Sequence, residues 1–401
     1  MVNNDQIVNY LINWLCYNDE QLAKRVAYTA DEKELETHDV LIVPNGSLGN
    51  RIVLPDMGKV VVETPVKGKA IIRTDILYNA FFFISRAEET FNTERDEHNR
   101  FAARFSLLGH NNRLHIPMLD EHARLLLKLL NAPQPEEGFH HIYLTHDIDA
   151  ITRYRSFRGA LGGIRRGEWQ QVKSALRDIH HDPIYTFPWM IEQDKRLTSN
   201  SPKDGLTSII YFVKDTPGKG YDYPQYNLHG SEFKQLKKML LDSGAQLGLH
   251  SSYYGLENGK VSRLPSFQSS NHQIFHRSHF LNCSLRQMMQ LVKAGITDDF
   301  TMGFADCAGF RLQTTRAVRW INPLTYQLTP LTLHPLTVMD CTLSNAGYMN
   351  LNEDEAYFLC ERLLAKVKMH HGDLCLLWHN SSFTPDTYHQ SLYTKLLQLL
   401  L

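Results

Sequence analysis

The chain has 401 residues, of which 43% are hydrophobic and 21% are charged. This length and composition are typical of a globular protein with a sizeable core, and they favour two domains over one. Its 42 lysines and arginines nearly balance its 43 aspartates and glutamates. The overall charge therefore gives no argument for binding nucleic acid or an anionic membrane.

The first residues lack a basic segment followed by an apolar run, so we expect no secretory signal. No stretch approaches the roughly 18 apolar residues of a membrane span. We therefore expect a cytoplasmic chain without a membrane span, in an oligomeric state that the sequence does not indicate. Because no two cysteines form a CxxC pair, we expect reduced thiols at Cys16, Cys283, Cys307, Cys341, Cys360 and Cys375.

Residues 1–132 are expected to form a smaller α/β domain. Apolar residues at helical spacing and short β-branched runs predict its elements. In chain order these are a helix at 7–15, strands at 40–44, 59–63 and 70–73, and helices at 76–89 and 119–130. A proline-rich stretch at 131–135 follows and predicts the domain boundary.

Residues 136–401 alternate strands with helices, which predicts a parallel sheet, either open or closed into a barrel. The predicted strands are 141–145, 207–213, 246–250, 301–304, 336–339 and 374–378. Polar residues that can cap a helix, and a Thr-Pro pair, predict helix starts at Ser231, Ser284, Asn352 and Thr384.

Several predicted strands end on residues that carry chemistry. In parallel α/β sheets, active sites lie at the carboxyl ends of the strands. Asp147 and Asp149 follow the first strand of this domain, and in extended chain they point to one side while His146 points to the other. Two carboxylates covered together repel and lose hydration, a conflict that a metal ion or a shared proton would relieve. Later strands end on His250, Asp340 and His379.

Each of these residues also has a structural interpretation. The two aspartates could cap backbone N–H groups, the histidines could be hydrogen-bonded within the core, and Asp340 could be a helix cap. Functionally, His379 could act as a general acid near neutral pH, with Asp340 orienting it. Arg277 could hold a carboxylate through a bidentate pair, and His279 would share its face in extended chain. The residues alone leave these alternatives open.

Other chemistries find no support in the sequence. It contains neither a glycine-rich phosphate loop nor a GxSxG nucleophile elbow. No basic face interleaves with the aromatic residues, so nucleic-acid binding is not expected.

Four short motifs follow one another along the second domain. They are Thr145-His-Asp-Ile-Asp149, His250-Ser-Ser-Tyr-Tyr254, Arg277-Ser-His-Phe280 and Leu376-Leu-Trp-His379. In this order they resemble the motifs of the polysaccharide deacetylases, the NodB-homology group of carbohydrate esterases, although the second matches only in its first half. The resemblance implies a distorted (β/α) barrel of the NodB type over 136–401, with the smaller α/β domain before it.

The resemblance also implies a role for each site residue. Asp149 and His250 would bind a divalent metal, with zinc the first expectation. The catalytic group would consist of Asp147 as the base, Arg277 as its partner, His379 as the acid and Asp340 as the carboxylate that orients His379.

One residue departs from the family pattern. Tyr254 stands where the second motif has its last histidine, which is a metal ligand in the family. A tyrosine binds metal only as phenolate, which is a poor ligand near pH 7. We expect His279 to supply the missing imidazole from the neighbouring loop. Otherwise the protein would no longer hold a metal.

The first domain carries Ile84-Ser-Arg-Ala-Glu-Glu89 and Asp96-Glu-His-Asn-Arg-Phe101. These stretches resemble an uncharacterised domain that is fused to deacetylase-like modules in capsule and surface-polysaccharide gene contexts. Together the resemblances imply a metal-dependent hydrolase that removes an N-acetyl group, or as second choice an O-acetyl group, from an acetylated saccharide. The expected cytoplasmic location favours a biosynthetic intermediate, such as a lipid- or nucleotide-linked sugar, over a finished extracellular polymer. Two alternatives remain open. One is a catalytically inactive glycan-binding or assembly module, which Tyr254 favours. The other is a hydrolase of a different acyl or amide substrate.

Overall fold

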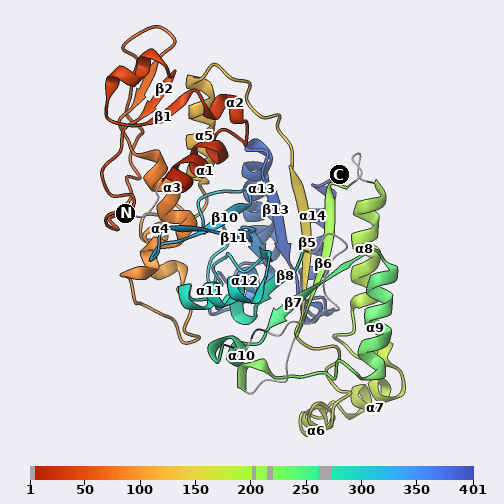
Figure 1. Cartoon of the computed structure of the whole chain (residues 1–401). Helices are drawn as coiled ribbons and strands as arrows, with labels where there is room; N and C mark the ends of the chain where they lie inside the picture. The colour runs from red at the N-terminus through yellow and green to blue at the C-terminus, as the bar shows by residue number, and fades with distance from the viewer. Residues whose placement is uncertain (1–4, 201–204, 215–219, 260, 262–272) are drawn as a thin grey trace.

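A sheet of nine strands forms the centre of the computed structural model, which describes residues 5–200, 205–214, 220–259, 261 and 273–401 (Figure 1). The strands are β5 (His141–Ile148), β6 (Thr207–Lys214), β7 (Gln246–Ser251), β8 (Phe275–Ser278), β9 (Asp298–Asp299), β10 (Val318–Asn322), β11 (Gln327–Leu333), β12 (Val338–Met339) and β13 (Asp373–Leu377). Their order across the sheet is β10-β11-β9-β8-β7-β6-β5-β13-β12. Among these pairs only β10 with β11 is antiparallel, so most strands end at one edge of the sheet.

The two faces of the sheet bury different side chains, because alternate residues of a strand point to opposite faces. Leu144, Tyr211 and Leu376 share a core with helices on one face. These helices are α8 (Phe187–Asn200), α9 (Ser231–Asp242), α13 (Glu353–Met369) and α14 (His389–Gln398). On the other face, Phe212 and Leu377 belong to a separate buried cluster. The sheet therefore curls around side chains of its own inner face.

The segment 327–339 links the two ends of the parallel row. It begins as β11, which pairs with β9, and the N–H of His334 then donates to the carbonyl of Asp299 at 2.8 Å. Further on, the N–H of Thr337 donates to the carbonyl of Cys375 at 3.0 Å, and β12 pairs with β13. The expected mixed α/β architecture is thus confirmed at the level of a curled sheet with helices between its strands. Within the described residues the strand order ends at β10 and β12, and a regular closed barrel is not seen.

The N-terminal part contains a second, smaller sheet in the order β1-β2-β4-β3. Its strands are β1 (Val26–Tyr28), β2 (Val40–Ile42), β3 (Val62–Glu63) and β4 (Ala70–Ile72), and its helices are α1 (Asp5–Leu15), α2 (Glu20–Ala23), α3 (Ile76–Ser85), α4 (Leu107–His110) and α5 (Met118–Leu129). Every residue of α3 is buried, and Phe81, Phe82 and Phe83 lie within one hydrophobic core.

This core also contains residues from the later part of the chain, including Trp320 and Leu331. Buried ion pairs cross between the same parts. Glu89 lies between Arg86 and Arg311, at 2.7 and 2.8 Å, and Asp120 accepts from Arg316 at 2.9 Å. The N-terminal part is therefore packed against the central sheet through apolar and charged groups alike.

The remaining helices connect strands of the central sheet. They are α6 (Phe157–Arg165), α7 (Trp169–Arg177), α10 (Tyr253–Glu257), α11 (Leu285–Ala294) and α12 (Asp340–Ser344). In the part of the chain that the structure describes, no helix combines the length and the apolar character needed to cross a bilayer. All six cysteines are free thiols, as expected.

Several expected boundaries are confirmed and others are wrong. Ser284 and Asn352 each form a capping box at a helix start. Ser231 is instead the first helical residue after Gly230, and the last helix begins at His389 rather than Thr384. The helix expected at 76–89 stops at Ser85, because the next residue adopts a left-handed conformation.

The strand expected at 301–304 is also wrong. The regular pairing ends at Asp299, whose carboxylate accepts from the N–H and hydroxyl groups of Thr301 at 3.1 and 2.6 Å. This local turn replaces ladder hydrogen bonds, an alternative that short polar side chains offer the backbone. Strands β1, β8, β9, β10 and β11 were not predicted, since their sequences lack a clean apolar alternation.

Candidate active site

The register of four parallel strands aligns the expected site residues. Asp147 on β5 pairs with Phe212 on β6, which pairs with Gly248 on β7. Two residues further along, Lys214 pairs with His250, and His250 pairs with Arg277 on β8. Side chains from four strands therefore meet at one edge. A pocket of about 200 Å³ opens there, lined by Arg100, Asp147, Asp149, His279, Phe280, Leu281, Met339, Cys341, Asn345, Tyr348 and His379.

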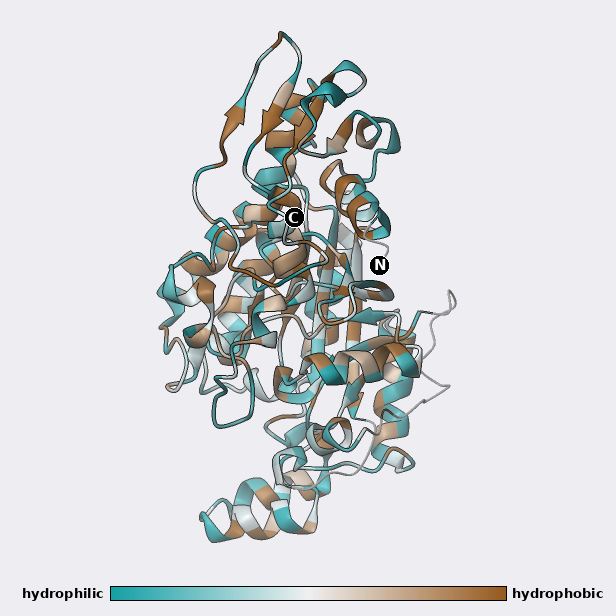
Figure 2. Ribbon diagram, turned by 60° about the vertical axis from the view of Figure 1, so that its left-hand side comes forward, coloured by the Kyte–Doolittle hydropathy of each residue, from teal (hydrophilic) through white to brown (hydrophobic). Residues whose placement is uncertain are grey.

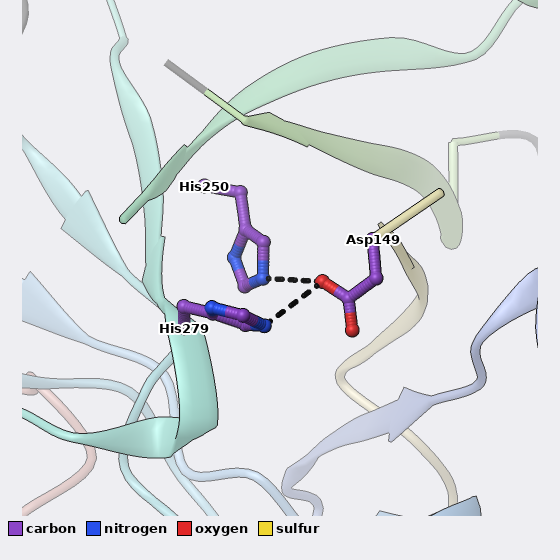
Figure 3. A group of neighbouring side chains, drawn as sticks. All are labelled: Asp149, His250 and His279. Atoms are coloured by element: carbon purple, nitrogen blue, oxygen red, sulfur yellow. Dashed lines mark ion pairs between the residues drawn. The ribbon is translucent and has the colours of Figure 1, made fainter. Parts of the chain in front are cut away.

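The three expected metal ligands converge on one point at the side of this pocket, which Asp149 and His279 line (Figure 3). Asp149 Oδ1 lies 3.3 Å from His250 Nε2 and 3.2 Å from His279 Nε2. Among the described residues, neither Asp149 Oδ1 nor His250 Nε2 has a hydrogen-bond partner, although both atoms are buried. Buried polar atoms without partners are uncommon, and an ion bound between these two would satisfy both.

The opposite nitrogen of each imidazole is held by an oxygen acceptor. His250 Nδ1 donates to the carbonyl of Arg277 at 3.0 Å, and His279 Nδ1 lies 3.0 Å from the carboxylate of Asp222. A carbonyl only accepts, so His250 carries its proton on Nδ1 and, when neutral, has its lone pair on Nε2. This outer arrangement is typical of metal-binding histidines, because it fixes the tautomer and the ring orientation.

The donor set fits a divalent metal. Two imidazole nitrogens and one carboxylate oxygen suit zinc, and they also suit iron, cobalt, nickel or manganese. Ligand atoms bound to a tetrahedral zinc at about 2.0–2.1 Å lie about 3.3 Å apart. The separations of 3.2 and 3.3 Å around Asp149 Oδ1 match that spacing. Asp149, His250 and His279 could therefore hold the ion together, with His279 in place of the histidine that Tyr254 replaces.

Electrostatics favours a charged carboxylate at this point. Burial alone would raise the pKa of Asp149, but His279, His250 and Lys214 outweigh it and hold that pKa well below its usual range. For His279, burial lowers the pKa, yet Asp149 and Asp222 reverse the effect and raise it. In the absence of an ion the two groups thus form a charge pair. Metal binding would displace the proton of His279.

Asp147 is held on one side by Arg277, a fully buried residue. Nη1 of Arg277 donates to Asp147 Oδ1 at 3.0 Å, while Nη2 donates to Thr145 Oγ1 at 2.8 Å. The expected bidentate pair between Arg277 and Asp147 is therefore absent, because the second terminal nitrogen of the guanidinium donates to Thr145 instead. Asp147 Oδ2 remains free of Arg277 and faces His250 and His379, at 3.7 and 4.0 Å.

His379 stands across the pocket from the arginine. Its Nδ1 lies 2.8 Å from Asp340 Oδ1, and its backbone N–H donates to Asp340 Oδ2 at 2.7 Å. Nε2 points toward the carboxylates of Asp149 and Asp147, at 3.7 and 4.0 Å. Burial alone would lower the pKa of His379, but the buried carboxylate of Asp340 outweighs it and raises the pKa well above its usual value. A protonated imidazole therefore faces the pocket.

All seven residues expected from the sequence lie in this one region. Three further residues were missed. Lys214 ends β6 with its Nζ 3.8 Å from Asp149 Oδ1, so the strand-end rule could have found it. Asp222 is the last residue of a short 3₁₀ helix, Gly220–Asp222, and no sequence signal marks it. Arg100 lines the pocket from the N-terminal part, inside a stretch that had been singled out only for its resemblance.

Tyr254 supports the site from behind instead of binding there. Its backbone N–H and that of Tyr253 donate to the carboxylate of Asp222, at 3.2 and 2.7 Å. Asp222 in turn holds His279. Helix α10, which begins at Tyr253, thus positions the carboxylate that orients the imidazole of His279.

A second group has the hydrogen-bond order of a nucleophilic triad. Ser251 Oγ lies 2.9 Å from His276 Nε2, and His276 Nδ1 lies 2.7 Å from Asp299 Oδ1. All three side chains are fully buried and none lines the pocket. A nucleophile must reach its substrate, so we interpret this group as a structural network between β7, β8 and β9.

Comparisons with known proteins give limited matches. Residues 2–135 match a family described as a family of unknown function, DUF7033. No curated protein sequence matches the chain. A crystal structure of a protein from Mycobacterium smegmatis, provisionally assigned as a polysaccharide deacetylase, is similar with a TM-score of 0.41 and 12% identity, over 67% of this chain and 88% of that one.

Proposed function

We propose that this chain is a metal-dependent hydrolase that removes the acetyl group from an N-acetylated sugar. The observation that carries the proposal is the convergence of His250 Nε2, His279 Nε2 and Asp149 Oδ1, with both imidazoles oriented from behind. Zinc is the metal we expect first. The sequence motifs around Asp147, Asp149, His250 and His379 resemble those of polysaccharide deacetylases and support the same reaction.

A divalent cation at this cluster would supply Lewis acidity, which polarises an acyl carbonyl and acidifies water. Asp147 is the proton acceptor in our proposal, because Arg277 occupies Oδ1 and leaves Oδ2 facing the pocket. A water oxygen forms a bond to the acyl carbon as its proton passes to Asp147. His379, protonated and held by Asp340, then gives its proton to the sugar nitrogen as the C–N bond breaks. The products are acetate and a free amine.

The pocket suits a small acyl group on a polar carrier. Phe280, Leu281 and Met339 provide an apolar wall, while Asn345 and Tyr348 provide hydrogen-bonding groups. An O-acetyl group is the second choice. We further propose that the reaction belongs to surface or capsular polysaccharide biosynthesis, which the resemblance of the N-terminal stretches supports. A lipid- or nucleotide-linked sugar is the intermediate we propose as substrate.

Replacing Asp147 with Asn tests the proposal. The amide keeps the shape of the carboxylate but does not accept the proton of water, so acetate release from N-acetylated sugars should fall by about 100-fold or more. Metal content, measured by elemental analysis, should stay near that of the wild type, since Asp147 lies outside the ligand set. Asp242→Asn, at an exposed position of α9, is the matched control. If Asp147→Asn retains acetate release, Asp147 is not the base.

The second candidate is a catalytically inactive module that binds glycans, and the tyrosine at position 254 is the observation in its favour. Such a protein would bind N-acetylated saccharides without releasing acetate, with or without metal. Elemental analysis of the purified protein together with an acetate-release assay separates the two candidates. Release from other acyl or amide substrates in the same assay would indicate a hydrolase of different specificity.

A further inference from the structure

Helices α6 and α7 carry apolar side chains on the outside of the molecule. Phe157, Leu161 and Ile164 follow the i, i+4, i+7 spacing of one helix face, and their exposed fractions are 85%, 36% and 54%. On α7, Trp169 and Leu176 are 57% and 52% exposed. Large apolar side chains gathered on one face are normally covered, so such a patch marks an interaction surface.

The opposite sides of these helices are already used. Val172 and Ala175 of α7 form a small buried cluster with Tyr154. The helices approach closely at Gly163, where a Cβ would come within 2.5 Å of Val172. The pair is also fastened to the body, because Arg155 of the preceding loop donates to Glu232 of α9 at 2.6 Å. The exposed apolar face is therefore the outer side of a folded unit, and Figures 1 and 2 show that this unit projects from the lower end of the molecule.

The same segment is strongly basic, although the whole chain has a net charge of -1. Residues 157–177 contain Glu168 as their one carboxylate. Their basic side chains, all exposed, are Arg158, Arg165, Arg166, Lys173 and Arg177. Basic side chains beside exposed Phe, Leu, Ile and Trp are typical of helices that lie in the surface of an anionic bilayer.

The patch adjoins the candidate active site. α6 begins eight residues after Asp149, and the guanidinium of Arg158 lies 5.2 Å from the ring of Tyr223. Tyr223 and Tyr221, on either side of Asp222, are half-exposed, and the ring of Tyr221 lies 5.4 Å from Phe280 in the pocket wall. Tyrosine and tryptophan are the residues that membrane interfaces favour. The basic and aromatic surface thus runs from α7 to the rim of the pocket.

We propose that α6 and α7, with Tyr221 and Tyr223, dock on the surface of an anionic lipid bilayer. Complementary charge selects this occupant over a second copy of the chain, whose equally basic α6 and α7 would repel. Docking turns the rim of the pocket toward the membrane. A pocket that faces the membrane would take a saccharide carried on a lipid as its substrate. This restriction of the substrate rests on the proposed function.

The chain contains a reporter for the test. Of its five tryptophans, Trp14, Trp320 and Trp378 are buried and Trp189 is half-buried, whereas Trp169 is exposed in the patch. The whole 401-residue chain, without substrate, is mixed with vesicles of phosphatidylcholine, either alone or together with phosphatidylglycerol. Sedimentation with the anionic vesicles, a blue shift of tryptophan emission and weakening at high salt are expected. Trp169→Phe should remove the blue shift while most sedimentation remains.

Two double variants separate the apolar contribution to vesicle binding from the basic one. Phe157→Ser with Ile164→Ser, and separately Arg165→Glu with Lys173→Glu, should each weaken vesicle binding by about tenfold or more. Phe358→Ser, at an exposed position of α13, is the matched control and should bind like the wild type. Equal binding to neutral and anionic vesicles, or binding that both double variants retain, would overturn the proposal. So would a concentration-dependent dimer, seen by light scattering, that Phe157→Ser with Ile164→Ser dissolves. No substrate is present in this experiment, so a protein without deacetylase activity would give the same binding result. Loss of vesicle binding would likewise leave the deacetylase proposal standing.

Discussion

His279 reaches the ligand cluster because the backbone turns sharply after it. Strand β8 ends at Ser278, and Phe280 and Leu281 adopt left-handed conformations with φ of 60° and 53°. Such conformations cost non-glycine residues about 1–2 kcal/mol each. Two arginines of the N-terminal part stabilise this turn. Arg100 donates to the carbonyl of Phe280 at 3.3 Å and Arg86 to that of Cys283 at 2.6 Å.

The ligand role of His279 leads to a direct prediction. His279→Ala removes one of the three atoms that would bind the metal. Loss of a residue that only hydrogen-bonds a metal ligand costs about 10–100-fold in metal affinity, so the affinity of His279→Ala for zinc should fall by more than that. Competition with a chromophoric chelator measures the affinity. His229→Ala, at an exposed histidine, should leave it unchanged. Unaltered affinity and stoichiometry in His279→Ala would remove this residue from the site.

At the scale of elements, parallel register does most of the assembly. A slip of one residue between β5 and β6, or between β7 and β8, would turn the site side chains to the opposite face. Gly248 allows the close contact between β6 and β7, since a Cβ there would lie 2.5 Å from the ring of Phe212. That ring lies 4.5 Å from the guanidinium of Arg277, the partner of Asp147.

Gly248→Ala should therefore disturb both packing and site. The added methyl group overpacks the inner face, and we expect a loss of about 1–3 kcal/mol in the free energy of unfolding, measured by denaturant titration. Acetate release should fall as Phe212 shifts against Arg277. Gly162→Ala is the control, because its Cβ would meet only the flexible end of Arg166. A variant of Gly248 with wild-type stability would show that the strands can separate to accept the methyl group.

At the scale of the whole molecule, the N-terminal part is continuous with the rest. It shares one core with Trp320 and Leu331, and it contributes Arg100 to the pocket. The carboxylate of Glu89 is buried between Arg86 and Arg311; burial alone would raise its pKa, yet the two guanidinium groups lower it to about 2. Separating the N-terminal part from the central sheet would leave buried charges of this group without partners. The two parts are therefore expected to unfold together.

Stability should fall in mild acid. Burial lowers the pKa of His122, on α5, to about 4, against 6.5 for an exposed histidine. Between pH 6.5 and 4 the unfolded chain therefore binds a proton that the folded chain does not, and the stability present above pH 6.5 is progressively lost. At pH 5 this one group should cost about 2 kcal/mol.

Denaturant titrations at pH 7.5 and pH 5 measure the effect. In His122→Leu the difference between the two pH values should shrink by about 2 kcal/mol, while His370, whose pKa burial also lowers to about 4, continues to contribute. His229→Leu should keep the wild-type difference. An unchanged difference in His122→Leu would mean that this side chain is solvated in the folded protein.

Much of the site could be predicted because its residues share one local signal. Asp147, Asp149, His250, Asp340 and His379 each stand where an apolar strand stops, and carboxyl ends of parallel strands meet at one edge. Asp222 escaped prediction because it ends a 3₁₀ helix of three residues, which is too short to give such a signal. The single hydrogen bond between Arg277 and Asp147 also escaped, since it depends on Thr145 competing for the same guanidinium.

The sequence by itself determined the strand and helix periods, the caps at Ser284 and Asn352, and the identity of the groups at the strand ends. These are local properties, set by neighbours a few residues apart. Only the tertiary structure decided that Asp222 lies behind His279, that Arg100 reaches the pocket from the other end of the chain, and that the apolar face of α6 is left uncovered. Each of these depends on which distant surfaces pack together. The pattern of residues within one segment does not specify which distant segments will pack against it.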